Sequence, residues 1–442
     1  MFMKKLLLLF FIVSFSMSSQ ILSEKERAIV KDEILAERFN ELLPQLMDRA
    51  DIDMWLVISR EYNEDPVMRT MLPATWLNAR RRTILVFYRN QDQNTIEKLA
   101  VARYDVGKNI ISAWDKEKQP SQWKALVDII KDRNPSKIGI NISENFGIAD
   151  GLVQTDYQEL KKALPLELEE KLVSAEKLAI AWIETRTERE MKLYETLVKI
   201  THEIIDEAFS EKVIVPGKTT TDDVVWWMRQ KVTDLGLETW FHPTIDVQRD
   251  NEELKSHIFS FSKGEKEKLI ISGDLLHCDF GITYIGLNTD CQQHAYVLKE
   301  DENSIPTFLA NAFKEGNRVQ DIFISNFKMG DSGNQILLKS LKEAKNEGLR
   351  PSIYTHPLGV DGHSAGPTIG MWDSQQGVPG TGDYPLYYNT VYAIELNTTV
   401  TINEWKKDIR IMLEEDGFYG ENGFRYINGR QELIKIVNPL KK

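Results

Sequence analysis

The chain has 442 residues, too many for one ordinary hydrophobic core, so its length predicts at least two domains. Its charged fraction of 28% and hydrophobic fraction of 42% are typical of a globular protein and exclude a disordered or fibrous one. A formal net charge of −12 argues against nucleic acid as a partner.

The first twenty residues have the pattern of a secretory signal peptide. Lys4 and Lys5 precede an apolar run over residues 6–15, and small residues at 16–20 offer a plausible cleavage site. The run is too short to span a bilayer, so no stable membrane insertion is expected after removal of the leader. We predict a signal peptide at residues 1–19 and export to the periplasm or the extracellular space. An uncleaved anchor at the membrane surface is the alternative.

Residues 20–175 predict a first domain in which helices and strands alternate. Apolar residues recur at helical spacing in some segments, and short β-prone runs lie between them. Helices are expected at 24–49 and 120–133, and strands at 54–59, 83–89, 99–106 and 137–142. This alternation favours a layered α/β domain. It shows no metal-ligand set and no phosphate-binding loop, so capping of a site and subunit contacts are its expected roles.

Residues 174–187 connect the two halves of the chain, and a pair of helices opens the second half. Thr187 and Glu190 form a capping-box pattern before an amphipathic helix. The sequence Val215-Pro-Gly217 breaks this helix, and a second helix is expected over residues 220–236.

Two aspartates eleven positions apart flank a pattern of strand, glycine-marked turn and strand. Gly281 and Gly286 supply the turn residues between Asp279 and Asp290. If the aspartates pair directly across an antiparallel hairpin, their side chains leave the same face about 5 Å apart. Two ionised carboxylates at that distance repel each other, which a core avoids and a divalent-metal site requires. A solvated hairpin face is the alternative for the pair alone.

More residues of the metal-ligand type follow downstream. His356 and His363 stand seven residues apart in a glycine-rich segment. Glu395 lies in the apolar, β-prone run 392–396, where an unpaired buried carboxylate costs several kcal/mol. Glu414 ends a further apolar strand.

Five of these residues follow one another in the order Asp279, Asp290, His356, Glu395 and Glu414. This order resembles the ligand set of the pita-bread metallohydrolases, which include methionine aminopeptidases, Xaa-Pro aminopeptidases, prolidases and creatinase. Glu414 rather than Glu415 takes the last place, because the glycine of the signature, Gly423, follows nine residues after it.

The resemblance covers about residues 180–435, with a looser match upstream. It implies an α/β (α+β) fold with a creatinase-like N-terminal domain at residues 20–175. A pita-bread catalytic domain is implied at residues 176–442, in the manner of two-domain Xaa-Pro aminopeptidases. The same resemblance implies a homodimer.

Two divalent metal ions are implied by the ligand set. Asp279 would bind one ion and His356 with Glu395 the other, while Asp290 and Glu414 would bridge them. The set has one nitrogen ligand and no sulfur, which favours Mn²⁺, with Co²⁺, Fe²⁺ or Zn²⁺ as alternatives. A hydroxide that bridges the ions would attack an N-terminal peptide bond of a peptide or small amide.

The remaining histidines divide into candidate catalytic residues and others. Besides Glu395, the catalytic candidates are His363, as a hydrogen-bond donor to the substrate, and His257, as the second active-site histidine of the family. His242 competes with His257 for that role. We interpret the other three as structural or surface residues, namely His202, His277 and His294.

Several positions depart from the family pattern. Relatives usually have proline, a Thr-Arg pair, arginine and histidine where this chain has Leu396, Gln292 with Gln293, Met412 and Ser352. All five metal ligands stay, so these departures put the substrate in doubt and not the metal centre. A non-peptidase metalloenzyme, either an amide hydrolase or a lyase, and a peptide-binding pseudoenzyme are therefore the alternatives.

The chain has two cysteines, Cys278 and Cys291, next to the two aspartates. Direct pairing of Asp279 with Asp290 would place the cysteines opposite each other on the face away from the metal. A cross-strand disulfide is then conceivable in an oxidising compartment. Two buried free thiols are the favoured alternative, because a single bulge would break this register.

Overall fold

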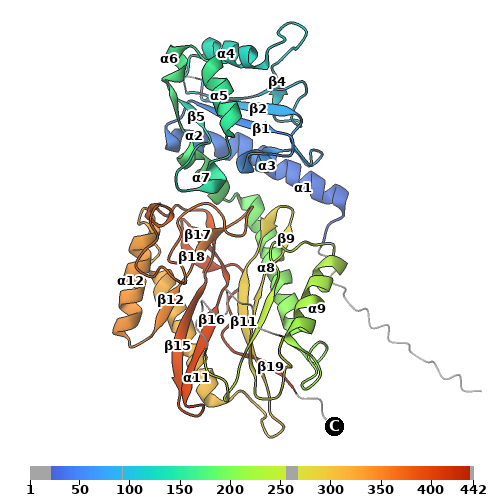
Figure 1. Cartoon of the computed structure of the whole chain (residues 1–442), viewed down its shortest axis with the longest axis vertical. Coiled ribbons are helices and arrows are strands. Elements are labelled where there is room, and N and C mark those ends of the chain that lie inside the picture. The colour runs from blue at the N-terminus through green and yellow to red at the C-terminus, as the bar shows by residue number, and fades with distance from the viewer. Residues whose placement is uncertain (1–20, 92, 255–266, 439–442) are drawn as a thin grey trace, which may run out of the picture.

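The computed structural model describes residues 21–91, 93–254 and 267–438, which form two domains stacked along the long axis of the molecule (Figure 1). The predicted signal peptide at residues 1–19 lies outside the described residues, and so does His257. Within the described ranges, no helix is both long and apolar enough to cross a membrane.

A six-stranded mixed sheet forms the centre of the N-terminal domain, with the strand order β4-β3-β2-β1-β5-β6. The strands are β1 (Met54–Arg60), β2 (Arg82–Asn90), β3 (Thr95–Val101), β4 (Ile111–Ser112), β5 (Ile138–Ile140) and β6 (Leu172–Ser174). β1 pairs antiparallel with β2 and parallel with β5. The predicted α/β layering of this domain is therefore confirmed.

Helices cover both faces of this sheet. Successive side chains of β1 point to opposite faces, so they enter two different cores in alternation. Trp55 and Val57 pack in one core, and Leu56 and Ile58 pack in the other. The helical segments are α1 (Glu24–Glu37), the π-helical η2 (Arg38–Leu42), α2 (Leu43–Ala50), α3 (Pro66–Met71), α4 (Gln122–Arg133), η3 (Gly147–Ala149), α5 (Gln154–Ala163), α6 (Leu166–Glu169) and α7 (Glu176–Glu184).

The predicted elements of this domain are found with shifted ends. The helix expected at residues 24–49 consists of α1, η2 and α2, which follow one another without a break. The strand expected at 99–106 ends at Val101. Residues 103–105 are exposed, and a carboxylate oxygen of Asp105 accepts a hydrogen bond from the Ser112 backbone N–H at 2.7 Å, which closes a loop.

A buried ion-pair network joins the two domains. The predicted boundary between residues 175 and 176 falls just before α7, which packs on the N-terminal core. α8 (Glu188–Ala208) then begins with the predicted capping box of Thr187 and Glu190. The Glu190 carboxylate accepts from Arg38 of the N-terminal domain at 2.8 Å and from Arg186 at 3.0 Å.

The C-terminal domain repeats one arrangement twice, a pair of helices followed by strands (Figure 1). The first half contains α8, α9 (Thr221–Asp234), β7 (Thr244–Gln248), β8 (Leu275–Phe280), β9 (Thr283–Tyr284), β10 (Leu287–Asn288) and β11 (Cys291–Val297). The second contains α11 (Thr307–Ser325), α12 (Gly333–Asn346), β12 (Pro351–Ile353), β13 (His356–Leu358), η4 (Thr381–Asp383), β14 (Thr390–Ala393), β15 (Leu396–Ile402), β16 (Lys407–Leu413), β17 (Asp416–Gly420) and β18 (Gly423–Tyr426), and β19 (Lys435–Val437) returns to the first half.

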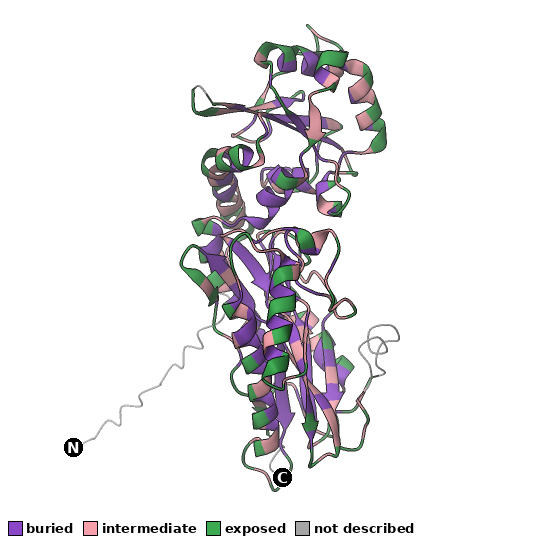
Figure 2. Ribbon diagram, turned by 90° about the vertical axis from the view of Figure 1, so that its left-hand side faces the viewer, coloured by how far each residue is buried: buried purple, intermediate pink, exposed green. Residues whose placement is uncertain are grey.

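The strands of this domain form sheets in the orders β19-β11-β8-β7, β12-β15-β16 and β13-β14-β17-β18, with β9 and β10 as a small separate hairpin. Figure 2 shows that the strands are mostly buried, whereas the outer faces of the helices are exposed. The sheets therefore meet in the interior, and polar residues at the ends of their strands can converge there.

The register between β8 and β11 corrects one expectation. Asp279 lies opposite Gln292, and Cys278 lies opposite Gln293, so Asp290 precedes the ladder and does not pair directly with Asp279. The register follows from the two-residue turn at Ile285 and Gly286, whose φ angles are both positive, because this turn lies at the centre of both the β9-β10 and the β8-β11 pairings. The two cysteines are consequently diagonal neighbours, and both are buried free thiols. Direct opposition of the cysteines was a wrong expectation, and free thiols are confirmed.

Candidate metal centre

Alternation along β8 and β11 directs four polar side chains to one face of their sheet. His277 and Asp279 are two residues apart on β8, and Asp290 and Gln292 are two residues apart at the start of β11. Residues at this spacing point to the same side of a strand. Asp279 and Gln292 are direct cross-strand neighbours, with Asp290 on the diagonal.

Glu414 joins this face from the end of β16. Its backbone N–H donates to the Gln292 carbonyl at 3.2 Å, and the Gln292 N–H donates to the Glu414 carbonyl at 2.9 Å. Asp416 lies behind, where its carboxylate accepts from the Asp290 backbone N–H at 3.1 Å. These bonds fix the main chain of Glu414 and of Asp290 without any cation.

His356 and Glu395 come from the remaining two sheets. His356 begins β13, and its Nδ1 lies 3.0 Å from the Pro357 carbonyl, which leaves Nε2 to face the acids. Glu395 stands between β14 and β15, and its carbonyl accepts from the Tyr354 N–H and the Thr355 hydroxyl, both at 3.0 Å. The structure thus brings all five predicted ligands to one place.

Four buried atoms of this cluster have no hydrogen-bond partner. Nε2 of His356 lies 3.7 Å from Oδ2 of Asp290 and 3.8 Å from Oε1 of Glu414. That same Nε2 lacks a partner, and so do Oδ1 of Asp279, Oδ1 of Asp290 and Oε1 of Glu414. Buried polar atoms rarely stay unsatisfied. A cation coordinated by these atoms would satisfy them, so the residues fit a divalent metal.

The acids are costly to hold together as charged groups. Burial, and then the charge of Asp279, raises the pKa of Glu395 to about 8, and burial raises the pKa of Asp279 to about 6. Burial first and neighbouring carboxylates next raise the pKa values of Asp290 and Glu414 well above their usual range. Burial lowers the pKa of His356 to about 3, which keeps the ring neutral and able to ligate a metal.

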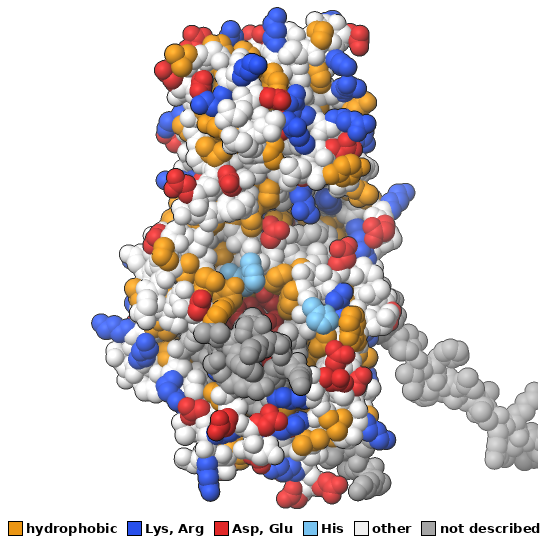
Figure 3. Space-filling model, in the orientation of Figure 1, with side chains coloured by type: hydrophobic (Ala, Val, Ile, Leu, Met, Phe, Trp, Pro, Cys, Tyr) orange, Lys and Arg blue, Asp and Glu red, His pale blue; other side chains and the backbone are white. Residues whose placement is uncertain are grey.

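The cluster opens into a cavity of about 460 Å³. Asp279, Gln292 and Glu395 line its inner end, and β7 supplies part of its wall. Figure 3 shows carboxylates at the floor of a hollow, below histidine side chains at its rim. Asp290, His356 and Glu414 lie deeper, each at most 4% exposed. Of the five predicted ligands, Asp279 and Glu395 are therefore the two that line the cavity.

The candidate catalytic histidines have different positions. The rings of His363 and His356 have their centroids 4.6 Å apart, and His363 is exposed at the rim of the site. Its Nε2 lies 3.5 Å from the Tyr354 hydroxyl. His242 lines the outer part of the cavity beside Arg229, at 3.1 Å from its guanidinium. His363 is thus the histidine nearest the cluster among the candidates that the structure describes.

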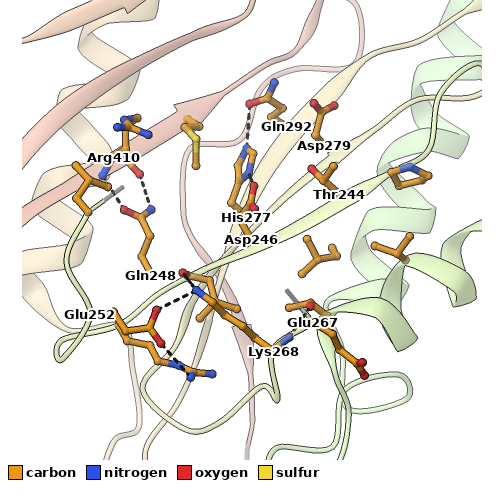
Figure 4. A pocket seen from close by; sticks show the side chains of 18 of the residues that line it. Thr244, Asp246, Gln248, Glu252, Glu267, Lys268, His277, Asp279, Gln292 and Arg410 are labelled. Carbon is orange, nitrogen blue, oxygen red and sulfur yellow. Dashed lines mark hydrogen bonds and ion pairs between the residues drawn. The ribbon is translucent and has the colours of Figure 1, made fainter. Parts of the chain in front are cut away.

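Two residues of the site escaped the sequence interpretation. His277 contacts the site, because its Nε2 lies 2.9 Å from the side-chain amide oxygen of Gln292, and its Nδ1 lies 3.3 Å from an Asp246 carboxylate oxygen (Figure 4). Gln292 reaches the acids directly. The signal was the two-residue spacing of His277 from Asp279 and of Gln292 from Asp290.

A second group of possible ligands lies behind the cluster. His202, Cys291 and Glu415 bring ligand-type atoms within 4.8 Å of one another. Both oxygens of Glu415 already accept hydrogen bonds, one from His202 at 2.6 Å and the other from Gln293 at 2.8 Å. His202 is therefore a partner of this buried acid, and His294 is structural, since its ring bonds the backbone of Leu276 and Met412.

Comparisons with known proteins identify the fold. No protein-family model and no curated protein matches the sequence. The structure resembles an X-Pro aminopeptidase from Thermotoga maritima (TM-score 0.61, 15% identity, covering 89% of this chain and 100% of the other). It also resembles an Xaa-Pro dipeptidase from Bacillus anthracis (TM-score 0.53, 18% identity, covering 94% and 100%).

The chain therefore has the two-domain fold of Xaa-Pro aminopeptidase and prolidase structures, a creatinase-type N-terminal domain followed by a pita-bread domain. The fold is also found in the N-terminal domain of the FACT complex subunit SPT16 from Cicer arietinum (TM-score 0.51, 12% identity, covering 93% and 97%). The fold is thus shared with metallopeptidases, but fold alone does not assign an activity.

Proposed function

We propose that the chain is a metal-dependent hydrolase that cleaves N-terminal peptide bonds, in the manner of an Xaa-Pro aminopeptidase. The observation that carries this proposal is the set of four unpartnered buried atoms on Asp279, Asp290, His356 and Glu414. A binding module gains nothing from a buried acidic cluster that destabilises it, whereas a metallohydrolase requires one.

Two divalent ions would be held by the five ligands, Mn²⁺ being the preferred metal. When bound, such ions supply an activated water and a Lewis acid that polarises the scissile carbonyl. Residues outside the ligand set would bind and orient the substrate. His363 at the rim is placed to donate a hydrogen bond to the substrate carbonyl, and Tyr354 lies 3.5 Å from its ring nitrogen, where it can orient the ring.

Two residues beside Glu395 bear on the choice of substrate. Ser352 and Met412 lie opposite Asn397 on β12 and β16, so the three form one row across the sheet. They line a small recess next to Glu395. This row favours a substrate that is not held by a charged terminal group at this point. An amide hydrolase or lyase with the same metal site is therefore the second candidate.

The cellular setting belongs to the same proposal. The leader pattern at residues 1–19 supports export from the cell. The net charge of −12 supports peptides or small amides, rather than nucleic acid, as partners. The two-domain fold that the chain shares with prolidase structures is compatible with a homodimer.

An activity panel tests the proposal. Purified protein loaded with Mn²⁺ should release N-terminal residues from some members of a panel of X-Pro peptides, other peptides and small amides. Chelation should abolish the release and Mn²⁺ should restore it. Metal-loaded protein that cleaves peptides but is insensitive to chelation, or that cleaves nothing in the panel, would contradict it.

A further inference from the structure

We infer that Gln292 is a positioning residue of the metal centre, because its side-chain amide joins Glu395 to Glu414. The amide nitrogen donates to Oε1 of Glu395 at 2.8 Å and to Oε2 of Glu414 at 2.9 Å. Gln292 is only 5% exposed, so these bonds are shielded from water. The inference rests on the proposed function, since it assigns both acids to a metal site.

Every hydrogen-bonding group of the Gln292 side-chain amide has a partner, and these partners define its orientation. A glutamine amide has two N–H donors, and each serves one carboxylate. Its carbonyl oxygen faces Nε2 of His277 at 2.9 Å, and Asp246 lies on the other side of that ring (Figure 4). When both acids are ionised, as metal ligands are, the reversed amide would place its oxygen against two carboxylates, which repel it. When both ring nitrogens of His277 carry a proton, Nε2–H donates to the amide oxygen and Nδ1–H donates to Asp246, and this pair then holds Gln292 with its donors toward the ligands.

The main chain holds the same residue in place. Gln292 exchanges two backbone hydrogen bonds with Glu414, at 2.9 Å and 3.2 Å, and lies opposite Asp279 in the β8–β11 ladder. One residue thus contacts three of the five predicted ligands, by backbone, by side chain or by register. No further movement of β11 is needed to bring the amide to the acids.

As a consequence, the two carboxylate oxygens of Glu414 have different roles. The amide takes Oε2 of Glu414, and the other oxygen, Oε1, is the one without a partner that faces His356. Gln292 thereby leaves Oε1 of Glu414 for a cation, and its amide nitrogen lies between the two carboxylates as a shared donor. A threonine at this position would have one hydroxyl donor and could serve only one of the two acids.

Calorimetric titration with Mn²⁺ alone tests the inference without any substrate. Gln292→Met keeps the side-chain volume nearly unchanged but removes the donors. Loss of a residue that orients metal ligands typically weakens metal affinity by about 10- to 100-fold. We expect a loss in that range, with an altered electron paramagnetic resonance spectrum of the Mn²⁺ pair. Circular dichroism and the melting temperature of metal-free protein report whether the variant folds.

The neighbouring glutamine provides a matched control. Gln293 points to the opposite face, where its amide donates to Glu415 at 2.8 Å and to none of the predicted ligands. Gln293→Met should therefore leave Mn²⁺ affinity unchanged, and Asp246→Asn, at the far end of the chain of bonds, should weaken it less than Gln292→Met does. Wild-type affinity in a folded Gln292→Met variant would overturn the inference alone. A wild-type protein that binds no Mn²⁺ would overturn both the inference and the proposed function.

Discussion

Met412 and Ser352 are the two residues whose identity bears most directly on the substrate. They stand where Xaa-Pro aminopeptidases place arginine and histidine, and both lie in the recess beside Glu395. Neither side chain carries a charge that could bind a substrate carboxylate. Their position was not evident from the sequence, because only the pairing of β12, β15 and β16 brings them into one row.

The double variant Met412→Arg with Ser352→His tests this reading. We expect the unmodified protein to cleave simple X-Pro dipeptides weakly. The variant should raise kcat/KM for them by about tenfold or more, which corresponds to about 1.4 kcal/mol of added transition-state binding. Steady-state kinetics on X-Pro and X-Ala dipeptides measure the change. Strong X-Pro hydrolysis by the unmodified protein would show that other residues recognise the substrate.

At the scale of the element, the hairpin from β8 to β11 depends on one close approach. A Cβ atom on Gly281 would lie 2.1 Å from the Thr289 carbonyl oxygen and 2.6 Å from the Trp240 indole nitrogen. These two atoms already share a hydrogen bond of 2.9 Å. The chain therefore needs glycine here for space rather than for a left-handed conformation.

Gly281→Ala should destabilise the fold by at least about 1–3 kcal/mol, the usual cost of overpacking. The clash is with backbone, which yields less easily than a flexible side chain. Denaturant unfolding of metal-free protein measures the effect. Gly147→Ala, where a Cβ would meet no heavy atom within 4 Å, should stay within about 0.5 kcal/mol of the wild type. Equal stability of the two variants would contradict the account.

The same hairpin predicts the state of the cysteines. Cys278 lies opposite Gln293 and Cys291 opposite Phe280, so no direct pair exists for a bridge. Protein unfolded without reductant should therefore titrate two free thiols per chain. Fewer than two would mean that the register shown here is not kept in the purified protein.

Most of the secondary structure, and the convergence of the five candidate ligands, could be predicted from the sequence. Helix starts such as Thr187 carry local capping signals. The candidate ligands could be recognised because their order and spacing resemble the pattern of a known family. The register of Asp279 could not be predicted, because it depends on which two residues of the connection form the turn, and the structure places that turn at Ile285 and Gly286. The role of Gln292 escaped for the same reason, since only the register places it between Glu395 and Glu414.

For the whole molecule, the acidic cluster links stability to pH and to metal. In the metal-free fold the pKa of Glu395 is raised from 4.5 to about 8, and that of Asp279 from 3.8 to about 6, burial being the main cause. The folded state therefore holds protons that the unfolded chain releases at lower pH. Unfolding then becomes easier as pH rises from about 4 to about 8.

We expect metal-free protein to lose several kcal/mol of stability between pH 5 and pH 8, since each unit of pKa shift corresponds to about 1.4 kcal/mol. Saturating Mn²⁺ should remove most of that loss, because the cations take the place of the protons. Thermal unfolding at both pH values, with and without Mn²⁺, provides the measurement. A metal-free protein that is more stable at pH 8 than at pH 5 would have the opposite sign and contradict the account.

The most direct test of the central claim is the metal content of the purified chain and of three variants, measured by elemental analysis. The wild type should hold two divalent ions per chain. Asp290→Asn and Glu414→Gln should lose both ions, because these residues would bridge them, whereas Asp279→Asn should keep one. No bound ion in the wild type, or full occupancy in Asp290→Asn and Glu414→Gln, would show that this cluster is not a dinuclear metal centre.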